Sequence, residues 1–325
     1  MYKKFIIKLG ISLIVLISIY SVFVLNFKMY YMNAEYPMWQ EVKDRSSNKT
    51  NIIEDIVILG DSRAKAGFKP SILKKTSSIN LSMGGATPLE GYYTIKKYLN
   101  HNPNPKNLII SYTPVHLSIS YGCFFSRTVP FDFLENNEYS QVEKLALQFS
   151  EFALLEKNAE FDTGENATYI KYKFPMIYGK SFINGILHRE WLKNYNFYKY
   201  LKKERGYHYF GTKDISHGLN EETEEKQFVV SRLYDYYFKK ILILMNKKHI
   251  KVYSYVMPFN ETSFKAVKKQ YDDQYEKYLL SLSKKYNMKI CNKVFYMPDS
   301  AFGDSSHLFH GVKKSTIDIV KCVEK

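Results

Sequence analysis

Cysteine is scarce in this chain of 325 residues, which has only Cys123, Cys291 and Cys322. An odd number excludes a framework in which every cysteine is paired within one chain. Cys291 ends an expected strand and Cys322 falls in an expected last helix, so these two can lie close enough to bridge. CxxC pairs and His/Cys clusters are also lacking, and the spacing His307-x-x-His310 alone is weak support for a zinc site. The sequence therefore predicts neither a metal nor a cofactor.

Acidic residues are outnumbered, with 32 Asp and Glu against 47 Lys and Arg, which gives a net charge of +15. Such a surface would concentrate anionic polymers or phospholipid head groups, although a general bias toward Lys, Asn, Ile and Tyr explains the charge equally well. Nucleic-acid motifs, internal repeats and low-complexity tracts are missing, so nucleic acid is not an expected partner. With 45% hydrophobic residues, the chain can bury the core of one large domain, with or without an insertion.

Long apolar runs are confined to the N-terminus. Leu9 to Leu25 form an uninterrupted run, and with Phe5 to Ile7 it is long enough to span a bilayer if Lys8 reaches the interface. The alternative is a cleaved signal peptide, but no small-x-small site follows the run. We therefore expect a single-pass anchor over residues 1–29, with the basic end inside and the rest of the chain extracytoplasmic.

Polar residues between Asn33 and Asn51 predict a linker over residues 30–51, followed by a folded domain over residues 52–325. Short apolar runs then alternate with expected helices, which predicts a three-layer α/β/α fold with a mainly parallel sheet of about five strands. Helices are expected over Glu138–Glu156 and Glu221–Lys247, and a large helical insertion at about 122–247. The expected strands are Ile56–Leu59, Ile79–Leu81, Leu108–Tyr112, Val252–Val256 and Met288–Cys291.

The triplet Gly60-Asp61-Ser62 directly follows the first apolar run. Ligands of open parallel sheets bind beyond the carboxyl ends of the strands. Gly60 permits a sharp turn there, and Ser62 at the start of a helix would present both its hydroxyl and its backbone N–H to a reacting carbonyl. The simpler alternative is that Asp61 or Ser62 only caps the helix.

A second motif near the C-terminus, Asp304-Ser305-Ser306-His307, supplies what a serine nucleophile needs. An imidazole takes the proton of the hydroxyl, and a carboxylate holds the imidazole in the correct tautomer. The spacing lets Asp304 and His307 point from one loop toward Ser62. The alternative for His307 is a capping or surface histidine, and His310 and Asp299 are reserve candidates.

Donors for an oxyanion hole are expected after the second and third strands. Gly84 and Gly85 allow backbone N–H groups to approach a bound oxygen closely, unless they belong to an ordinary loop. Thr113 follows the third strand, where its side chain could complete the hole together with the N–H of Ser62.

The order of these blocks resembles the SGNH/GDSL hydrolase superfamily over about residues 52–121 and 248–325. The resemblance implies that Ser62 is the nucleophile, that Gly84 or Gly85 donates to the oxyanion, and that Asp304 and His307 complete the triad. The third block departs from the family pattern Gly-x-Asn-Asp, because this chain has Ser111-Tyr112-Thr113-Pro114.

The anchor and the insertion are similar to those of envelope-associated members that move acyl groups onto extracellular polymers, in alginate O-acetylation and in D-alanyl transfer to lipoteichoic acid. This likeness implies a serine esterase or O-acyltransferase acting on an ester of a cell-envelope polysaccharide, with a multi-pass membrane acyl donor as partner. Tyr178, Trp191 and Tyr195 are candidate carbohydrate platforms, or they pack the core of the insertion. The alternatives are a non-catalytic polymer-binding scaffold and, if the anchor is removed, a secreted lipase.

Overall fold

A parallel sheet lies at the centre of the molecule. The computed structural model describes residues 2–157 and 175–324. Its five strands are arranged in the order β2-β1-β3-β4-β6, and every pairing is parallel. The α/β fold expected from the sequence is confirmed, and each expected strand overlaps an observed one. The strands are β1 (Ile56–Gly60), β2 (Ser78–Asn80), β3 (Asn107–Ser111), β4 (Lys251–Ser254) and β6 (Lys289–Ile290).

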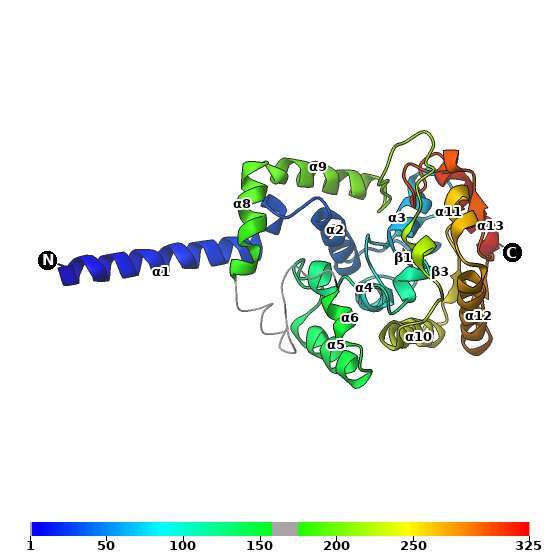
Figure 1. Cartoon of the computed structure of the whole chain (residues 1–325), viewed down its shortest axis with the longest axis horizontal. Helices are drawn as coiled ribbons and strands as arrows, with labels where there is room; N and C mark the ends of the chain where they lie inside the picture. The colour runs from blue at the N-terminus through cyan, green and yellow to red at the C-terminus, as the bar shows by residue number, and fades with distance from the viewer. Residues whose placement is uncertain (1, 158–174, 325) are drawn as a thin grey trace.

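Helices cover both faces of this sheet (Figure 1). Successive side chains of a strand point to opposite faces, so Val57 and Leu59 join one core cluster whereas Ile56 and Ile58 join another. The first cluster includes residues of α4 (Pro88–His101), α10 (Arg232–Lys247) and α12 (Lys269–Tyr286). The second includes residues of α3 (Ser62–Gly67) and α13 (Val312–Glu324). Burial on both faces explains why β1 is a continuous apolar run.

The chain between β3 and β4 is longer than a crossover requires. Among its described residues, the helices before α10 are α5 (Asn136–Gln148), α6 (Phe152–Glu156), α8 (Gly179–Leu187) and α9 (Glu190–Lys203). α10 is itself the crossover helix, because it packs on α4 and β4. The predicted insertion at about 122–247 is therefore too long at its C-terminal end, and the additional structure ends before Arg232. Residues 158–174 lie outside the described part of the chain.

The helix expected over Glu138–Glu156 is divided into α5 and α6. The break lies at Ser150, whose φ of 60° is in the left-handed region. Beside it, the carboxylate of Glu151 accepts hydrogen bonds from the N–H groups of Arg232 and Leu233, at 2.8 and 3.0 Å. These are free N–H groups at the first turn of α10, so Glu151 caps another helix instead of continuing its own.

The helix expected over Glu221–Lys247 begins later, at Arg232. The hydroxyl of Ser231 accepts the backbone N–H of Tyr234 at 3.1 Å, which is the geometry of a helix N-cap. Residues 221–224 form a separate 3-10 turn. The apolar spacing that continues upstream of Ser231 belongs to a segment without helical structure.

The prediction of a linker over residues 30–51 is wrong, because most of this segment is the helix α2 (Tyr36–Ser47). Pro37 stands in its first turn, where the missing N–H costs nothing. Met38, Trp39 and Val42 are buried on one side of the helix. The indole of Trp39 packs against the rings of Phe131 and Phe133. α2 contacts both α4 and α9, so the segment belongs to the folded domain.

Helix α1 (Tyr2–Asn26) extends away from the rest of the molecule (Figure 1). Its side chains are exposed along nearly its whole length, and only Val24 near its end is buried. The helix has 25 residues and is apolar enough to cross a membrane. The predicted N-terminal span therefore corresponds to one continuous helix.

The C-terminal part of the chain leads from the sheet to the candidate site. Strands β5 (Phe259–Asn260) and β7 (Tyr296–Met297) form a second, parallel pair, and the short helix α11 (Glu261–Ala266) follows β5.

Short 3-10 or π turns are also present: η1 (Lys28–Tyr30), η2 (Pro70–Ile72), η3 (Val115–Leu117), η4 (Phe124–Thr128), η6 (Pro175–Tyr178), η7 (Glu221–Glu224) and η8 (Asp299–Ala301).

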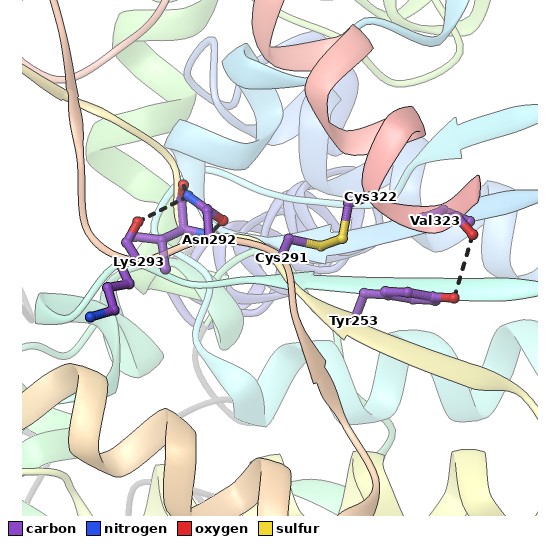
Figure 2. The surroundings of a disulfide bond; sticks show 7 residues. Tyr253, Cys291, Asn292, Lys293, Cys322 and Val323 are labelled. Atoms are coloured by element: carbon purple, nitrogen blue, oxygen red, sulfur yellow. Dashed lines mark hydrogen bonds between the residues drawn. A yellow bond between two sulfur atoms is a disulfide. The ribbon is translucent and has the colours of Figure 1, made fainter. Parts of the chain in front are cut away.

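A disulfide joins Cys291, just after β6, to Cys322 in α13. Figure 2 shows this bond beside Tyr253 of β4, whose hydroxyl donates a hydrogen bond to the carbonyl of Val323. The bridge thus ties the last helix to the edge of the sheet. Cys123 is a free, buried thiol, so the pairing considered in the sequence is the one that forms.

Candidate active site

Ser62 begins α3 at the carboxyl end of β1. A Cβ at Gly60 would lie 2.0 Å from the carbonyl oxygen of Ser111 on the neighbouring strand and 2.5 Å from the Cβ of Ala64. Only glycine therefore permits the chain to turn this close to β3. The turn delivers the Ser62 hydroxyl to the edge of the sheet where ligands of parallel sheets bind.

Asp61 is the fixed point of this turn and is fully buried. One carboxylate oxygen accepts the backbone N–H of Arg63 at 2.9 Å, which makes Asp61 the N-cap of α3. Its other oxygen accepts two hydrogen bonds from Thr113, from the N–H at 2.6 Å and from the hydroxyl at 2.7 Å. The alternative reading of Asp61 as a cap is thus correct for this residue, and the cap joins β1 to the end of β3.

This arrangement departs from the expectation that Thr113 donates to an oxyanion. Both of its donors, the N–H and the hydroxyl, are directed to the Asp61 carboxylate. A hydroxyl has a single hydrogen to donate, so Thr113 positions the turn that carries Ser62 instead of facing a substrate. Its contribution to the site is indirect.

His307 lies between Ser62 and Asp304. Its Nε2 is 2.7 Å from the Ser62 hydroxyl, and its Nδ1 is 2.8 Å from the nearer Asp304 oxygen. The carboxylate also accepts the backbone N–H groups of Ser306 and His307, at 2.8 and 2.7 Å. The structure brings together the three residues that the two motifs predicted, in the geometry that a general base requires.

The loop stabilises the ionised form of the Asp304 carboxylate. Burial alone would raise the pKa of the carboxyl, but the hydrogen bond and charge of His307, with the N–H groups of Ser306 and His307, bring the pKa below its usual range. An ionised carboxylate keeps the Nδ1 proton on the imidazole and leaves Nε2 to accept the serine proton. The loop is closed by the N–H of Gly303, which donates to the carbonyl of His307 at 3.0 Å.

The insertion covers this loop through residues that sequence reasoning missed. The ring of Phe210 lies against the imidazole of His307, with 4.4 Å between centroids, and the ring of His208 contacts Phe210 edge-on, with 4.9 Å between centroids. Burial, followed by the charges of Lys65 and His307, lowers the pKa of His208 to about 3. His208 is therefore a neutral aromatic neighbour, and the only signal in the sequence is the aromatic run from Tyr207 to Phe210.

Two glycines let the insertion approach the triad loop. A Cβ on Gly211 would lie 2.2 Å from the carbonyl oxygen of Gly303, and a Cβ on Gly303 would lie 2.0 Å from that of Gly211. The N–H of Lys213 donates to the carbonyl of Gly303 at 3.0 Å. The two backbones are thus in direct contact immediately before Asp304.

The predicted oxyanion glycines lie in the loop after β2. The N–H of Gly84 donates to the sulfur of Met38 in α2 at 3.4 Å, and a Cβ on Gly84 would contact the ring of Phe210. Gly84 therefore lies beside the ring that packs on His307. Gly85 has a φ of +76° and faces the side chain of Arg127. Met38 was missed because its segment was expected to be a linker.

The reserve candidates are engaged elsewhere. Asp299 accepts the N–H and the hydroxyl of Thr262, at 3.0 and 2.6 Å, and also contacts His217. His310 lies 3.7 Å from Asp214 on the surface. Within residues 2–157 and 175–324, no group of three or more His, Cys, Asp or Glu side chains could hold a metal ion.

The candidate carbohydrate platforms lie away from the triad. Trp191 and Tyr195 line a pocket of about 640 Å³ together with Phe27 and Lys28 at the end of α1, and no triad residue lines it. Tyr178 is buried, and its hydroxyl donates to the carbonyl of Pro130 at 3.2 Å. Tyr178 is thus a packed core residue, but its ring contacts Tyr31 and Lys28 outside the insertion, so the alternative of packing in the insertion's own core is correct only in part.

No protein-family model matches the sequence, and the search of curated proteins finds no significant match. The chemistry of the chain must therefore be inferred from the geometry of the site.

Proposed function

We propose that this protein is a membrane-anchored, extracytoplasmic serine esterase or O-acyltransferase of the SGNH/GDSL type. One observation carries the proposal: the imidazole of His307 contacts the Ser62 hydroxyl through Nε2 and the Asp304 carboxylate through Nδ1. A histidine that only caps a helix or lies on the surface would not be expected to contact both Ser62 and Asp304, which come from distant parts of the chain. This arrangement activates a hydroxyl for attack on an ester.

In the reaction, Ser62 Oγ attacks the carbonyl carbon of the ester while His307 Nε2 takes the hydroxyl proton. The tetrahedral intermediate breaks the bond to the leaving oxygen, which receives that proton, and the acyl group remains on Ser62. Water or a sugar hydroxyl then gives its proton to His307 and attacks the acyl carbon. Ser62 leaves with the proton from His307, so the enzyme is regenerated.

The oxyanion of the intermediate would be stabilised by backbone N–H groups. That of Ser62 lies at the N-terminus of α3, where the first N–H groups of a helix lack partners within the helix. That of Gly84 is directed at the Met38 sulfur, a weak acceptor that a negatively charged oxygen would replace. Gly85 and Thr113 have no such role in this proposal.

Two features support an extracytoplasmic domain. The N-terminal part of the apolar α1 carries Lys3, Lys4 and Lys8, and basic residues favour the cytoplasmic side of a membrane span. The Cys291–Cys322 disulfide belongs to the other side, because disulfides persist in oxidising compartments outside the cytoplasm. An envelope polysaccharide or related polymer is then an accessible substrate, and a multi-pass membrane protein is the proposed source of the acyl group.

Hydrolysis of a chromogenic acetyl ester by the full-length protein in mild detergent tests this proposal. Ser62→Ala and His307→Ala should each lower kcat/KM by at least about 10³-fold. Ser305→Ala, in the same loop, and His310→Ala, two residues beyond it, are matched controls and should retain nearly full activity. If the folded wild-type protein were inactive, or if all four variants matched it, the non-catalytic polymer-binding scaffold would become the better account.

A further inference from the structure

Apolar side chains are exposed where α8 meets α9, which we call the elbow (residues 179–195). Six of them are at least 45% exposed, from Trp191 at 45% to Leu187 at 72%. Monomeric soluble domains rarely expose contiguous apolar patches without a partner. The exposed apolar residues of the elbow are Ile183, Ile186, Leu187, Trp191, Leu192 and Tyr195.

The elbow is fixed against the end of α1 (Figure 1). The ring of Phe182 lies 5.4 Å from that of Tyr20 and 5.6 Å from that of Phe23. The side-chain amide of Asn194 donates to the carbonyl of Met29 at 3.0 Å and to that of Met32 at 2.8 Å. Both helices of the elbow therefore hold a defined position relative to α1.

A close backbone approach strengthens this attachment. A Cβ on Gly185 would lie 2.1 Å from the carbonyl oxygen of Tyr31 and 2.4 Å from its Cα. Only glycine lets α8 lie directly on the chain that leaves α1. The hydroxyl of Tyr31 in turn donates to the carbonyl of Val24, at 2.5 Å, within α1.

The contacts of Phe182 give the depth of the elbow. From Phe5 to Leu25 a helix rises about 30 Å, which equals the thickness of a bilayer's hydrocarbon core. Tyr20 and Phe23 then lie about 3 to 8 Å inside the outer boundary of that core. Because Phe182 contacts both rings, α8 lies at the level of the outer boundary, with its exposed apolar side chains beside the lipid.

Charges on the elbow fit the same location. Lys180, Arg189 and Lys193 of the elbow and Lys199, one turn beyond it, are exposed, and in the described part of the chain only Lys193 of the elbow forms an ion pair, with Glu190. Lysine and arginine at the edge of an interfacial helix attract anionic lipid head groups, while tryptophan and tyrosine favour the head-group level. The elbow thus has exposed apolar side chains, basic side chains, and a tryptophan and a tyrosine, which are the features of a segment that lies in the membrane interface.

We propose that the elbow is a second membrane-binding surface, which lies in the outer-leaflet interface next to α1. This proposal rests on the proposed anchoring of α1 but not on the activity of Ser62. α9 then leads from the bilayer, over about 21 Å, to the segment that places Phe210 on His307. The elbow would thereby hold the triad at a set height and orientation above the membrane, where a single flexible tether could not.

The two tryptophans provide a direct test, because Trp191 is on the elbow and Trp39 is buried in the domain. The full-length protein is reconstituted into vesicles of phosphatidylcholine and phosphatidylglycerol, with or without bromine on the acyl chains. Wild-type fluorescence should lose the Trp191 emission in brominated vesicles. Trp191→Phe leaves only Trp39 as reporter, and its emission should be equal in both kinds of vesicle.

Charge substitutions separate the elbow from the anchor. Leu187→Asp should restore much of the Trp191 emission in brominated vesicles, whereas Leu280→Asp, an exposed leucine on α12 (48% exposed), should not. Unquenched Trp191 in protein that floats with the vesicles would overturn the proposal. Failure to float would contradict the anchoring of α1 and this proposal together. Ser62→Ala should be quenched like the wild type, so a failed esterase assay leaves this result independent.

Discussion

His307 Nε2 lies 2.7 Å from Ser62 Oγ, although the two residues are 245 positions apart in the chain. The turn at Gly60 fixes one partner, and the loop between Phe302 and Leu308 fixes the other, through the antiparallel bridge that these two residues form. Because each partner is held by backbone contacts, the pair is formed before any substrate binds. Such preorganisation is what acyl transfer requires of its nucleophile and base.

Asp304→Asn should lower kcat for ester hydrolysis by about 10³ to 10⁴-fold, with a smaller change in KM, because an amide no longer holds the tautomer of His307 that accepts the serine proton. Steady-state kinetics on a chromogenic ester checks this. Asp299→Asn is the matched control, since Asp299 binds Thr262 and His217 outside the triad. Equal losses in the two variants would remove the special role of Asp304.

Glu222→Gln should destabilise the fold by about 3 to 5 kcal/mol, because it removes the counter-charge that is hydrogen-bonded to the buried guanidinium of Arg63. The two side chains form a buried ion pair, and Arg63 is in the first turn of α3, next to Ser62. The double variant Arg63→Met with Glu222→Leu should lose less than Glu222→Gln alone. Denaturant unfolding monitored by circular dichroism measures both, and a double variant less stable than the single one would contradict this account.

His208 should make the protein sensitive to acid. Its folded-state pKa is lowered to about 3, chiefly by burial, from 6.5. Between these values the unfolded chain binds a proton that the native site excludes, so stability is complete above about pH 6.5 and falls as the pH decreases through this window.

The substitution His208→Phe removes this loss of stability at low pH, while a phenylalanine ring can keep the contacts with Phe197 and Phe210. Its Tm should therefore decrease less than that of the wild type between about pH 7 and pH 4. His101→Phe, at an exposed histidine, serves as the control and should follow the wild type. Parallel curves for the wild type and His208→Phe would show that the site does not exclude the proton.

Removal of the disulfide by Cys291→Ser with Cys322→Ser should cost about 3 to 4 kcal/mol, the value expected from loop-closure entropy for a bridge across 31 residues. Thermal unfolding with and without a reductant checks this prediction. Reductant should lower the Tm of the wild type and leave that of the double variant unchanged. If reductant left the wild type unaffected, the bridge would not stabilise the fold.

The sequence was sufficient to predict the sheet and the contact between Ser62, His307 and Asp304, for physical reasons. Strands buried on both faces must be apolar throughout, so Ile56 to Leu59 could be recognised without a partner. Ser62, Asp304 and His307 stood in short motifs whose chemistry depends on local spacing. Both kinds of signal are contained within a few neighbouring residues.

What the sequence concealed depends on contacts between distant segments. α2 reads as polar because charged residues surround Met38, Trp39 and Val42, and only packing on α4 and α9 reveals that these three are its buried side. Phe210 is one of 22 phenylalanines, and nothing near it in the chain indicates that it reaches His307. Thr113 followed the expected strand, but its partner Asp61 could be found only in three dimensions.

Labelling by a fluorophosphonate tests the central claim most directly, because this probe reacts covalently with an activated serine. Intact-mass analysis of the full-length protein should show one adduct, located on Ser62 by peptide mapping. Ser62→Ala should abolish the adduct, His307→Ala should slow its formation by orders of magnitude, and Ser305→Ala should leave it unchanged. A folded protein that forms no adduct, or one that is labelled equally well without His307, would contradict the triad.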